Sequence, residues 1–331
     1  MSLGRVLTLK DGNKIPQIGL GTWLSKPGEV KAAVEHALKV GYRHIDAALI
    51  YGNQEEVGQA LKTTSVPRKE IFITSKLWNN SHRPEFVEKD LDLTLKQLGT
   101  DYLDLYLIHW PVPFKPGDEL SPANEDGTEA LLDLDGGPSI VDTWKAVIAV
   151  QKTGKVKSIG VSNFTVAHLE KIISATGVVP VMNQVEAHPA LQQPELEKYC
   201  EEKGIKITAY SPLGNNVSGK VRIIDTVPVQ KLAKEQGRDA AQILIAWGAH
   251  KGFCVIPKSV TPKRIESNFD DLELSAKEFE AISKVGRENP VRYNIPYLYK
   301  PRWDIDVFVE NKGLTIVVGS EEEKAAKHKV R

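Results

Sequence analysis

Short apolar runs and longer amphipathic stretches alternate along most of the chain. Two brief alternating runs on either side of Asp11-Gly12-Asn13 open the sequence and predict a β-hairpin. Eight later runs have the length and apolar content of strands, and they cover residues 17–23, 44–48, 71–77, 104–110, 156–164, 181–187, 206–214 and 254–259. Between them, apolar residues recur every three or four positions, which predicts helices over residues 26–41, 53–62, 83–99, 140–154, 166–176, 194–204, 228–236 and 240–252.

Two of the predicted helices carry recognisable end signals. Pro84 stands in the first turn of the helix over 83–99, and Gly99 follows its last turn. Asn53 and Glu56 have the spacing of a capping pair, so we expect them to cap the start of the helix over 53–62.

The alternation of eight strands with helices predicts a parallel sheet covered by helices. The count of eight favours a closed (β/α)8 TIM barrel with an N-terminal β-hairpin over an open doubly wound sheet. Continuous apolar strands with few polar breaks fit burial on both faces of such a sheet. No internal repeat or linker interrupts the pattern, so residues 1–331 are predicted to form a single domain.

Three long segments interrupt the regular pattern. Residues 110–137 are acidic and rich in Pro and Gly, residues 211–226 follow the seventh strand, and a tail with aromatic residues begins at Pro290. Long loops inside a compact domain are usually functional or disordered. We expect the first two, and the aromatic part of the tail over 290–331, to lie over the barrel mouth. The last dozen residues are expected to be disordered.

The composition is that of a globular protein with balanced charge. Lys and Arg total 43, as do Asp and Glu, so no basic surface is available to attract a nucleic acid. No apolar run approaches the roughly 18 residues of a membrane span, and the polar N-terminus does not resemble a secretory signal. Cys200 and Cys254 have no metal-binding spacing. These observations indicate a cytoplasmic protein, and the lack of a coiled-coil pattern favours a monomer.

Four residues with complementary chemistry follow or end three of the strands: Asp46, Tyr51, Lys76 and His109. In a parallel barrel these positions meet at the carboxyl-terminal mouth, where such barrels carry their active sites. A phenol with an ordinary pKa of about 10 is a poor acid at neutral pH, and a neighbouring ammonium lowers that pKa. We therefore expect Lys76, held by Asp46, to acidify Tyr51. His109 is expected to orient a carbonyl oxygen or share the proton transfer. Each residue alone is more typical of a satisfied core or surface position, so the prediction depends on the combination.

Other catalytic motifs are missing from the sequence. GLGTWL lacks the third glycine of a dinucleotide fingerprint, and the chain has no GxSxG, P-loop or HExxH motif. His44 and Asp46 share a strand, as in a metal-dependent barrel hydrolase, but no later cluster completes a metal shell. No metal is therefore expected, and His44 is expected to be packed. We expect His82 to lie on the surface, and His188 to lie near the site without a partner that the sequence identifies.

A candidate anion site follows the last strand. Lys258, Ser259, Thr261 and Arg264 place two cations and two hydroxyls at a helix N-terminus, and phosphate sites of barrels often lie near the last two strands. The 2′-phosphate of NADPH would fit two cations. An ordinary helix start with solvated Lys and Arg explains the spacing equally well.

These residues lie in stretches that resemble the aldo-keto reductases. The matching stretches are GLGTW, GYRHIDAALIYGNQEEVG, TSKLW, DLYLIHWP, IGVSNF, NQVEAHP, AYSPLG and IPKSVTPKRIESN. The resemblance runs from the opening hairpin to about Phe269. It implies the NADPH-dependent reduction of aldehydes or ketones, reversible with NADP+, on small-molecule carbonyl substrates.

The resemblance also implies roles for individual residues. Tyr51 would be the general acid, tuned by Lys76 and Asp46, and His109 would position the carbonyl. The cofactor would be held by Tyr210, Ser162, Asn163 and Gln184 at the nicotinamide, Ser211 and Leu213 at the pyrophosphate, Lys258, Ser259 and Arg264 at the 2′-phosphate, and Asn268 near the adenine. The apolar substrate wall would be Trp23, Ile50, Trp78 and Trp110, with Trp303 and Tyr297 reaching over the mouth from the tail.

The chain departs from many members of the family at two places. Ser267 stands where relatives have a glutamate that binds the adenine. Leu24 and the Asn215-Asn216 region stand where some relatives have a Lys–acid latch over the pyrophosphate, so we expect no latch and fast cofactor exchange. Within the family, the tail resembles the fungal glycerol dehydrogenase, glyceraldehyde reductase and sugar reductase group, which implies small polyhydroxy aldehydes such as glyceraldehyde, pentoses or uronates, or glycerol in reverse.

One alternative function shares the same fold. An NADP(H)-sensing binding module would keep the cofactor site without significant turnover. The two functions differ in whether aldehydes consume bound NADPH.

Overall fold

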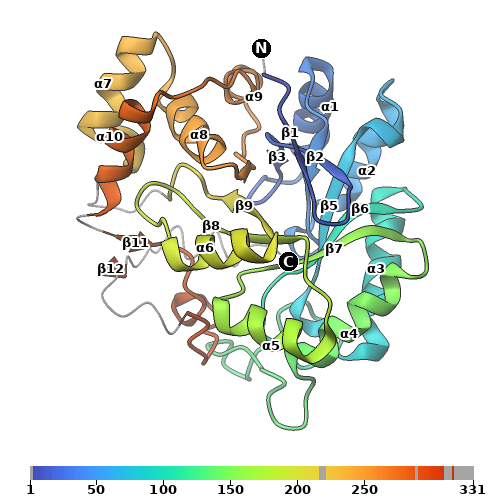
Figure 1. The fold of residues 1–331 in the computed structure, drawn as a ribbon. Helices are drawn as coiled ribbons and strands as arrows, with labels where there is room; N and C mark the ends of the chain where they lie inside the picture. The colour runs from blue at the N-terminus through green and yellow to red at the C-terminus, as the bar shows by residue number, and fades with distance from the viewer. Residues whose placement is uncertain (1–2, 216–220, 288–289, 309–314, 317–331) are drawn as a thin grey trace.

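The computed structural model describes residues 3–215, 221–287, 290–308 and 315–316 (Figure 1). Its centre is an eight-stranded sheet in which every neighbouring pair is parallel. In order of hydrogen bonding the strands are β10 (Cys254–Val255), β9 (Lys206–Tyr210), β8 (Met182–Glu186), β7 (Val156–Ser162), β6 (Leu103–Ile108), β5 (Phe72–Leu77), β4 (His44–Asp46) and β3 (Leu20–Gly21). The first and last strands also meet, because Gly19 N donates to Val255 O at 2.9 Å and Gly21 N to Pro257 O at 3.0 Å. The predicted closed barrel is therefore confirmed.

Helices surround this sheet in chain order (Figure 1). They are α1 (Val30–Val40), α2 (Gln54–Thr63), α3 (Pro84–Leu98), α4 (Ile140–Gln151), α5 (Val166–Thr176), α6 (Pro194–Lys203), α7 (Val227–Gln236), α8 (Ala240–His250), α9 (Pro262–Phe269) and α10 (Ala276–Arg287), with 3-10 turns at Leu49–Tyr51, Arg68–Glu70, Asn79–Ser81, Ile223–Asp225 and Pro296–Leu298. The predicted ends of α3 are confirmed, since Pro84 begins the helix and Gly99 ends it with a φ of 62°. Helix α10 was not predicted from the sequence.

The N-terminal hairpin closes the amino-terminal end of the barrel. Strands β1 (Val6–Thr8) and β2 (Lys14–Pro16) pair antiparallel around the predicted turn. Ile15 is fully buried and belongs to an apolar cluster with Phe72 and Met182, the first residues of β5 and β8. With that end covered, the carboxyl-terminal end is the open face of the barrel.

The predicted capping pair at the start of α2 is wrong. The Asn53 side chain makes no capping bond and instead donates to Thr22 O at 2.9 Å. The Glu56 carboxylate accepts from the backbone of Gly28 and Val30, at 2.7 and 2.8 Å, at the start of the neighbouring helix α1. Because α1 and α2 pack side by side, Glu56 caps a helix that is distant in sequence.

Two segments cover the open end and are joined to each other. We call residues 111–139 the insertion and residues 290–308 the tail. Ala130 N donates to Arg302 O, and Arg302 N donates to Thr128 O, each at 2.8 Å. Fully buried Asp133 anchors the insertion by accepting from Arg83 at 2.8 Å and Lys115 at 3.0 Å. The insertion and the tail therefore form one cover over the mouth.

The end of the chain is only partly described. Beyond the tail, β12 (Thr315–Ile316) pairs in parallel with β11 (Val291–Arg292). The expected disorder of the last dozen residues concerns positions outside the described residues, as does the part of the 211–226 segment that covers 216–220.

Candidate active site

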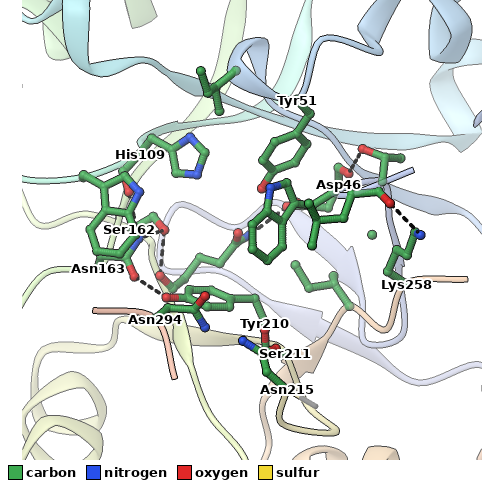
Figure 2. Close-up of a pocket in the computed structure, with 18 of the residues that line it drawn as sticks. Asp46, Tyr51, His109, Ser162, Asn163, Tyr210, Ser211, Asn215, Lys258 and Asn294 are labelled. Carbon is green, nitrogen blue, oxygen red and sulfur yellow. Dashed lines mark hydrogen bonds between the residues drawn. The ribbon is translucent and has the colours of Figure 1, made fainter. Parts of the chain in front are cut away.

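A cavity of about 400 Å³ opens at the carboxyl-terminal end of the barrel, beneath the insertion and the tail (Figure 2). Strand ends and the loops that follow them supply most of its polar residues, the tail supplies part of its apolar wall, and the insertion contributes Ser121. The predicted residues that line it are Trp23, Asp46, Ile50, Tyr51, Trp78, His109, Trp110, Ser162, Asn163, Gln184, Tyr210, Ser211, Leu213, Lys258 and Trp303.

Lys76 lies behind this cavity and joins Asp46 to Tyr51. Its Nζ donates to Asp46 Oδ1 at 2.6 Å, to Ala47 O at 2.9 Å and to the Tyr51 hydroxyl oxygen at 3.3 Å. An ammonium has three donors, so all are used. Lys76 is fully buried and Asp46 is 1% exposed. The second Asp46 oxygen accepts from Gln184 Nε2 at 2.7 Å, so the carboxylate is held from two strands.

The Tyr51 hydroxyl faces the cavity from the short 3-10 turn Leu49–Tyr51, which follows β4 (Figure 2). Because its oxygen accepts from Lys76, its own proton can point to a ligand. Burial, followed by the charges of Asp46 and Tyr299, raises the pKa of Tyr51 well above its ordinary value. The expected lowering of the Tyr51 pKa by Lys76 is therefore not seen, because burial is the largest cause of the shift and the charges of Asp46 and Tyr299 add to it. The phenol is protonated at neutral pH, which is the form an acid needs.

His109 lies across the cavity from Tyr51, with the ring centroids 5.7 Å apart. Burial, followed by the charge of Lys76, lowers the pKa of His109 well below its ordinary value, so the ring is neutral. Its Nδ1 is buried with no hydrogen-bond partner among the described residues. The nitrogen left to meet a ligand is therefore Nε2.

The four residues expected at a nicotinamide form one hydrogen-bond network. Tyr210 donates to Asn163 Oδ1 at 2.7 Å, and Asn163 donates to Ser162 Oγ at 3.1 Å. Ser162 in turn donates to the Gln184 backbone at 2.8 Å. Asn163 has a φ of 63°, a conformation that non-glycine residues rarely adopt outside functional sites. The network fixes the Tyr210 ring at one side of the cavity, where Figure 2 shows it beside Asn294 and Ser211.

The expected phosphate residues lie at the opposite end, only partly in the cavity. Lys258 lines it and donates to Leu24 O at 3.0 Å (Figure 2). Arg264 is exposed on the first turn of α9. Ser259 is buried just before that helix and Asn268 is buried within it, and both are outside the cavity lining. Ser267, the family departure, bonds within its own helix through Arg264 O at 3.4 Å.

The substrate wall contains residues that the sequence did not identify. Asn294, Tyr299 and Lys300 of the tail and Ser121 of the insertion also line the cavity. The expected contribution of Tyr297 is not seen, because Tyr299, two positions further, takes the place at the mouth. The spacing of Asn294 and Tyr299 in YNIPYLY follows neither a helical nor a strand period. Only the path of the tail in the structure shows that both residues line the cavity.

Among the histidines other than His109, one prediction is confirmed and one is wrong. His44 is buried as expected, and burial lowers its pKa to about 4. His82 was expected on the surface but is 1% exposed, because the insertion and α4 cover the turn after β5; burial lowers its pKa to about 3. His188 has a partner that the sequence did not identify, since its Nε2 lies 2.9 Å from Glu186.

The described part of the chain lacks two kinds of feature. It contains no helix that is both long and apolar enough to cross a membrane. Nor does it bring together three or more His, Cys, Asp or Glu side chains in a group that could hold a metal ion.

A closed parallel barrel with a phenol, an ammonium–carboxylate pair and a neutral imidazole at its carboxyl end has the arrangement of a (β/α)8 enzyme. Comparison with known proteins narrows this class. The profile of the Aldo/keto reductase family matches residues 17–287. The chain therefore belongs to the aldo/keto reductase family, and it is an oxidoreductase.

Individual relatives cover nearly the whole chain. It is 53% identical over 339 residues to a D/L-glyceraldehyde reductase of Hypocrea jecorina, covering 99% of this chain and 98% of the relative. It is 44% identical over 302 residues to aldo-keto reductase family 1 member A1 of Homo sapiens, covering 88% and 91%. A solved aldose reductase structure from Schistosoma japonicum matches with a TM-score of 0.79 at 41% identity, covering 85% of this chain and 92% of that one.

Proposed function

We propose that this enzyme reduces small polyhydroxy aldehydes to alcohols with NADPH, and oxidises such alcohols with NADP+ in reverse. The observation that carries the proposal is the Lys76 hydrogen bond to the Tyr51 oxygen, because it leaves the phenol proton available to a carbonyl oxygen in the cavity. The name of the Hypocrea jecorina relative supports glyceraldehyde as a member of the substrate class. Pentoses and uronates belong to the same class, and glycerol is the corresponding alcohol.

The side chains have distinct parts in this reaction. Tyr51 gives its proton to the carbonyl oxygen, and Lys76 stabilises the phenolate that remains. Asp46 offsets the cost of burying the Lys76 charge. Neutral His109 donates a hydrogen bond from Nε2 to the same carbonyl oxygen, which orients it toward Tyr51.

The residues at the Lys258 end of the cavity fit an NADPH cofactor. The Arg264 guanidinium has no hydrogen-bond partner among the described residues, and the N-cap residue Thr261 makes no side-chain cap, so the first turn of α9 can receive an anion. The 2′-phosphate would be held by Lys258, Ser259 and Arg264, and the adenine would lie near Asn268. The pyrophosphate would contact Ser211 and Leu213. The nicotinamide would be held by Ser162, Asn163, Gln184 and Tyr210. When bound, NADPH supplies the hydride.

The proposal is tested by incubating the purified protein with NADPH and a panel of aldehydes, and following the loss of cofactor absorbance. The panel contains glyceraldehyde, a pentose, a uronate and an aromatic aldehyde. We expect oxidation of NADPH, with the highest kcat/KM for the hydroxylated aldehydes. Tight binding of NADPH without oxidation by any aldehyde would refute the proposal in favour of an NADPH-sensing module.

Arg264→Ala is expected to weaken NADPH binding by about 10- to 100-fold, because hydrogen bonds to a charged group contribute about 1.5–3 kcal/mol. NADH, which lacks the 2′-phosphate, should bind the variant as it binds the wild type. Fluorescence titration with both cofactors measures this difference. Lys263→Ala removes an exposed cation from the same helical turn and is the matched control. An unchanged preference for NADPH in Arg264→Ala would place the 2′-phosphate elsewhere.

Binding of NADPH is expected to be fast and to lack a slow closing step. Leu24 and Asn215 both line the cavity, and neither can form an ion pair across it; Asn216 lies outside the described residues. Stopped-flow fluorescence should therefore show one phase whose rate rises linearly with NADPH concentration. A slow, concentration-independent phase that limits turnover would contradict this expectation. The double variant Leu24→Lys, Asn215→Asp introduces the missing pair and should create such a phase.

A further inference from the structure

The carboxylate of Glu186 connects the barrel to the tail. Glu186 is the last residue of β8 and is fully buried. Its Oε1 accepts from His188 Nε2 at 2.9 Å and from Tyr293 N at 2.8 Å. Its Oε2 accepts from Asn294 N and from Asn294 Nδ2, each at 2.8 Å. A carboxylate has about four lone-pair positions, and these four donors fill them.

The charge of Glu186 is retained in this buried place. Burial is the largest influence, and it opposes ionisation. It is outweighed by hydrogen bonds from His188 and Tyr293 together with the charges of His188 and Arg292. The pKa of Glu186 is therefore lowered to about 2. Arg292 is 1% exposed and donates to Gln193 Oε1 at 2.9 Å, while Gln193 Nε2 donates to Glu186 O at 2.9 Å. The start of the tail is thus bound to the end of β8 from both sides.

This connection fixes a side chain that lines the cavity. Asn294 uses its Nδ2 on Glu186, and its amide oxygen has no hydrogen-bond partner among the described residues. The amide lies near Tyr210 in the close-up (Figure 2), and Tyr210 pairs with Glu186 in the sheet register. Further along the tail, Tyr299 and Trp303 line the same cavity. The position of Glu186 therefore affects both an acceptor and part of the wall of the substrate pocket.

We propose that Glu186 is the positioning residue for selectivity toward hydroxylated aldehydes: its carboxylate holds Asn294 so that the amide oxygen faces a substrate hydroxyl. This inference rests on the proposed reductase function. An aromatic aldehyde without hydroxyls makes no use of that acceptor, so its reduction does not depend on Glu186. The residues that would hold the 2′-phosphate lie at the opposite end of the cavity, and none of the four residues proposed at the nicotinamide donates to the Glu186 carboxylate, so the binding of NADPH does not depend on it either.

Glu186→Gln tests the proposal, because it keeps the side-chain volume and replaces one acceptor oxygen by a donor that faces N–H groups. We expect kcat/KM for glyceraldehyde to fall about tenfold, mainly through KM. The value for an aromatic aldehyde and the Kd for NADPH should stay near wild type. Hydrogen–deuterium exchange at the amides of Tyr293 and Asn294 should become faster. Glu129→Gln is the matched control, since Glu129 also pairs with the tail, through Arg302, but at an exposed position.

A second variant keeps the proposal testable if Glu186→Gln does not fold. Asn294→Leu should lower the ratio of glyceraldehyde to aromatic kcat/KM, and the double variant should be no more impaired than Asn294→Leu alone. Equal losses on both aldehydes, or an unchanged ratio in Asn294→Leu, overturn the proposal. If the wild type reduces no aldehyde, the proposed function fails. In that case unchanged exchange at Tyr293 and Asn294 in Glu186→Gln separately overturns the role of Glu186 in holding the tail.

Discussion

Tyr51→Phe should lower kcat for aldehyde reduction by about 10²- to 10⁴-fold, the range that general acid catalysis contributes. The variant keeps the ring against Trp23 and His109 but lacks the proton that faces the cavity. The Kd for NADPH should therefore stay near wild type. Because the pKa of Tyr51 lies above its ordinary value, the wild-type phenol stays protonated across neutral pH, and its reductive kcat should vary little there.

Steady-state kinetics with saturating NADPH, together with a fluorescence titration of the cofactor, check this expectation. Tyr42→Phe is the matched control. Tyr42 is also buried, but its hydroxyl donates to Ile265 O at 2.9 Å outside the cavity lining. That variant should lose some stability and keep its kcat. Near wild-type turnover in Tyr51→Phe would remove Tyr51 from the role of acid.

Lys76→Met should reduce the free energy of unfolding by about 3–5 kcal/mol, the usual cost of removing one partner from a buried ion pair. The ammonium and the carboxylate are 0% and 2% exposed at their side chains, so water cannot replace the lost partner. Asp46 would keep only the hydrogen bond from Gln184. Turnover should fall as well, because nothing would stabilise the Tyr51 phenolate.

The double variant Lys76→Met, Asp46→Asn separates these two effects. It contains no buried charge at this place, so it should recover much of the stability while remaining inactive. Urea denaturation followed by circular dichroism compares the single and the double variant with wild type. A single variant as stable as wild type would show that Asp46 is not ionised in the fold.

The barrel could be predicted because local and global signals agree in its strands and helices. The apolar runs that become β5 and β6 are buried along their whole length, which is the pattern that a parallel sheet requires. Asp46, Lys76 and His109 could be placed together because the carboxyl ends of parallel strands meet at one face. That argument needs only the order of strands.

Other features depend on contacts between distant segments, and the sequence alone did not reveal them. Glu56 caps α1 rather than its own helix, which follows from the way that two helices pack. His82 is buried because a long insertion covers it, and Asn294 reaches the cavity because Glu186 holds the tail. The upward shift of the Tyr51 pKa comes from burial, followed by the charges of Asp46 and Tyr299, and these surroundings exist only in the folded chain.

The cover formed by the insertion and the tail has a consequence for how substrate range changes between relatives. Arg302 and Glu129 are 173 positions apart, yet their side chains pair, and the Arg302 backbone forms hydrogen bonds with Thr128 and Ala130, the neighbours of Glu129. A chimera with a single crossover between them would join an insertion from one parent to a tail from another. The hydrogen bonds between the insertion and the tail would then have to form between segments that come from different parent proteins. A new specificity would therefore be transferred intact only when both segments are inherited from the same parent.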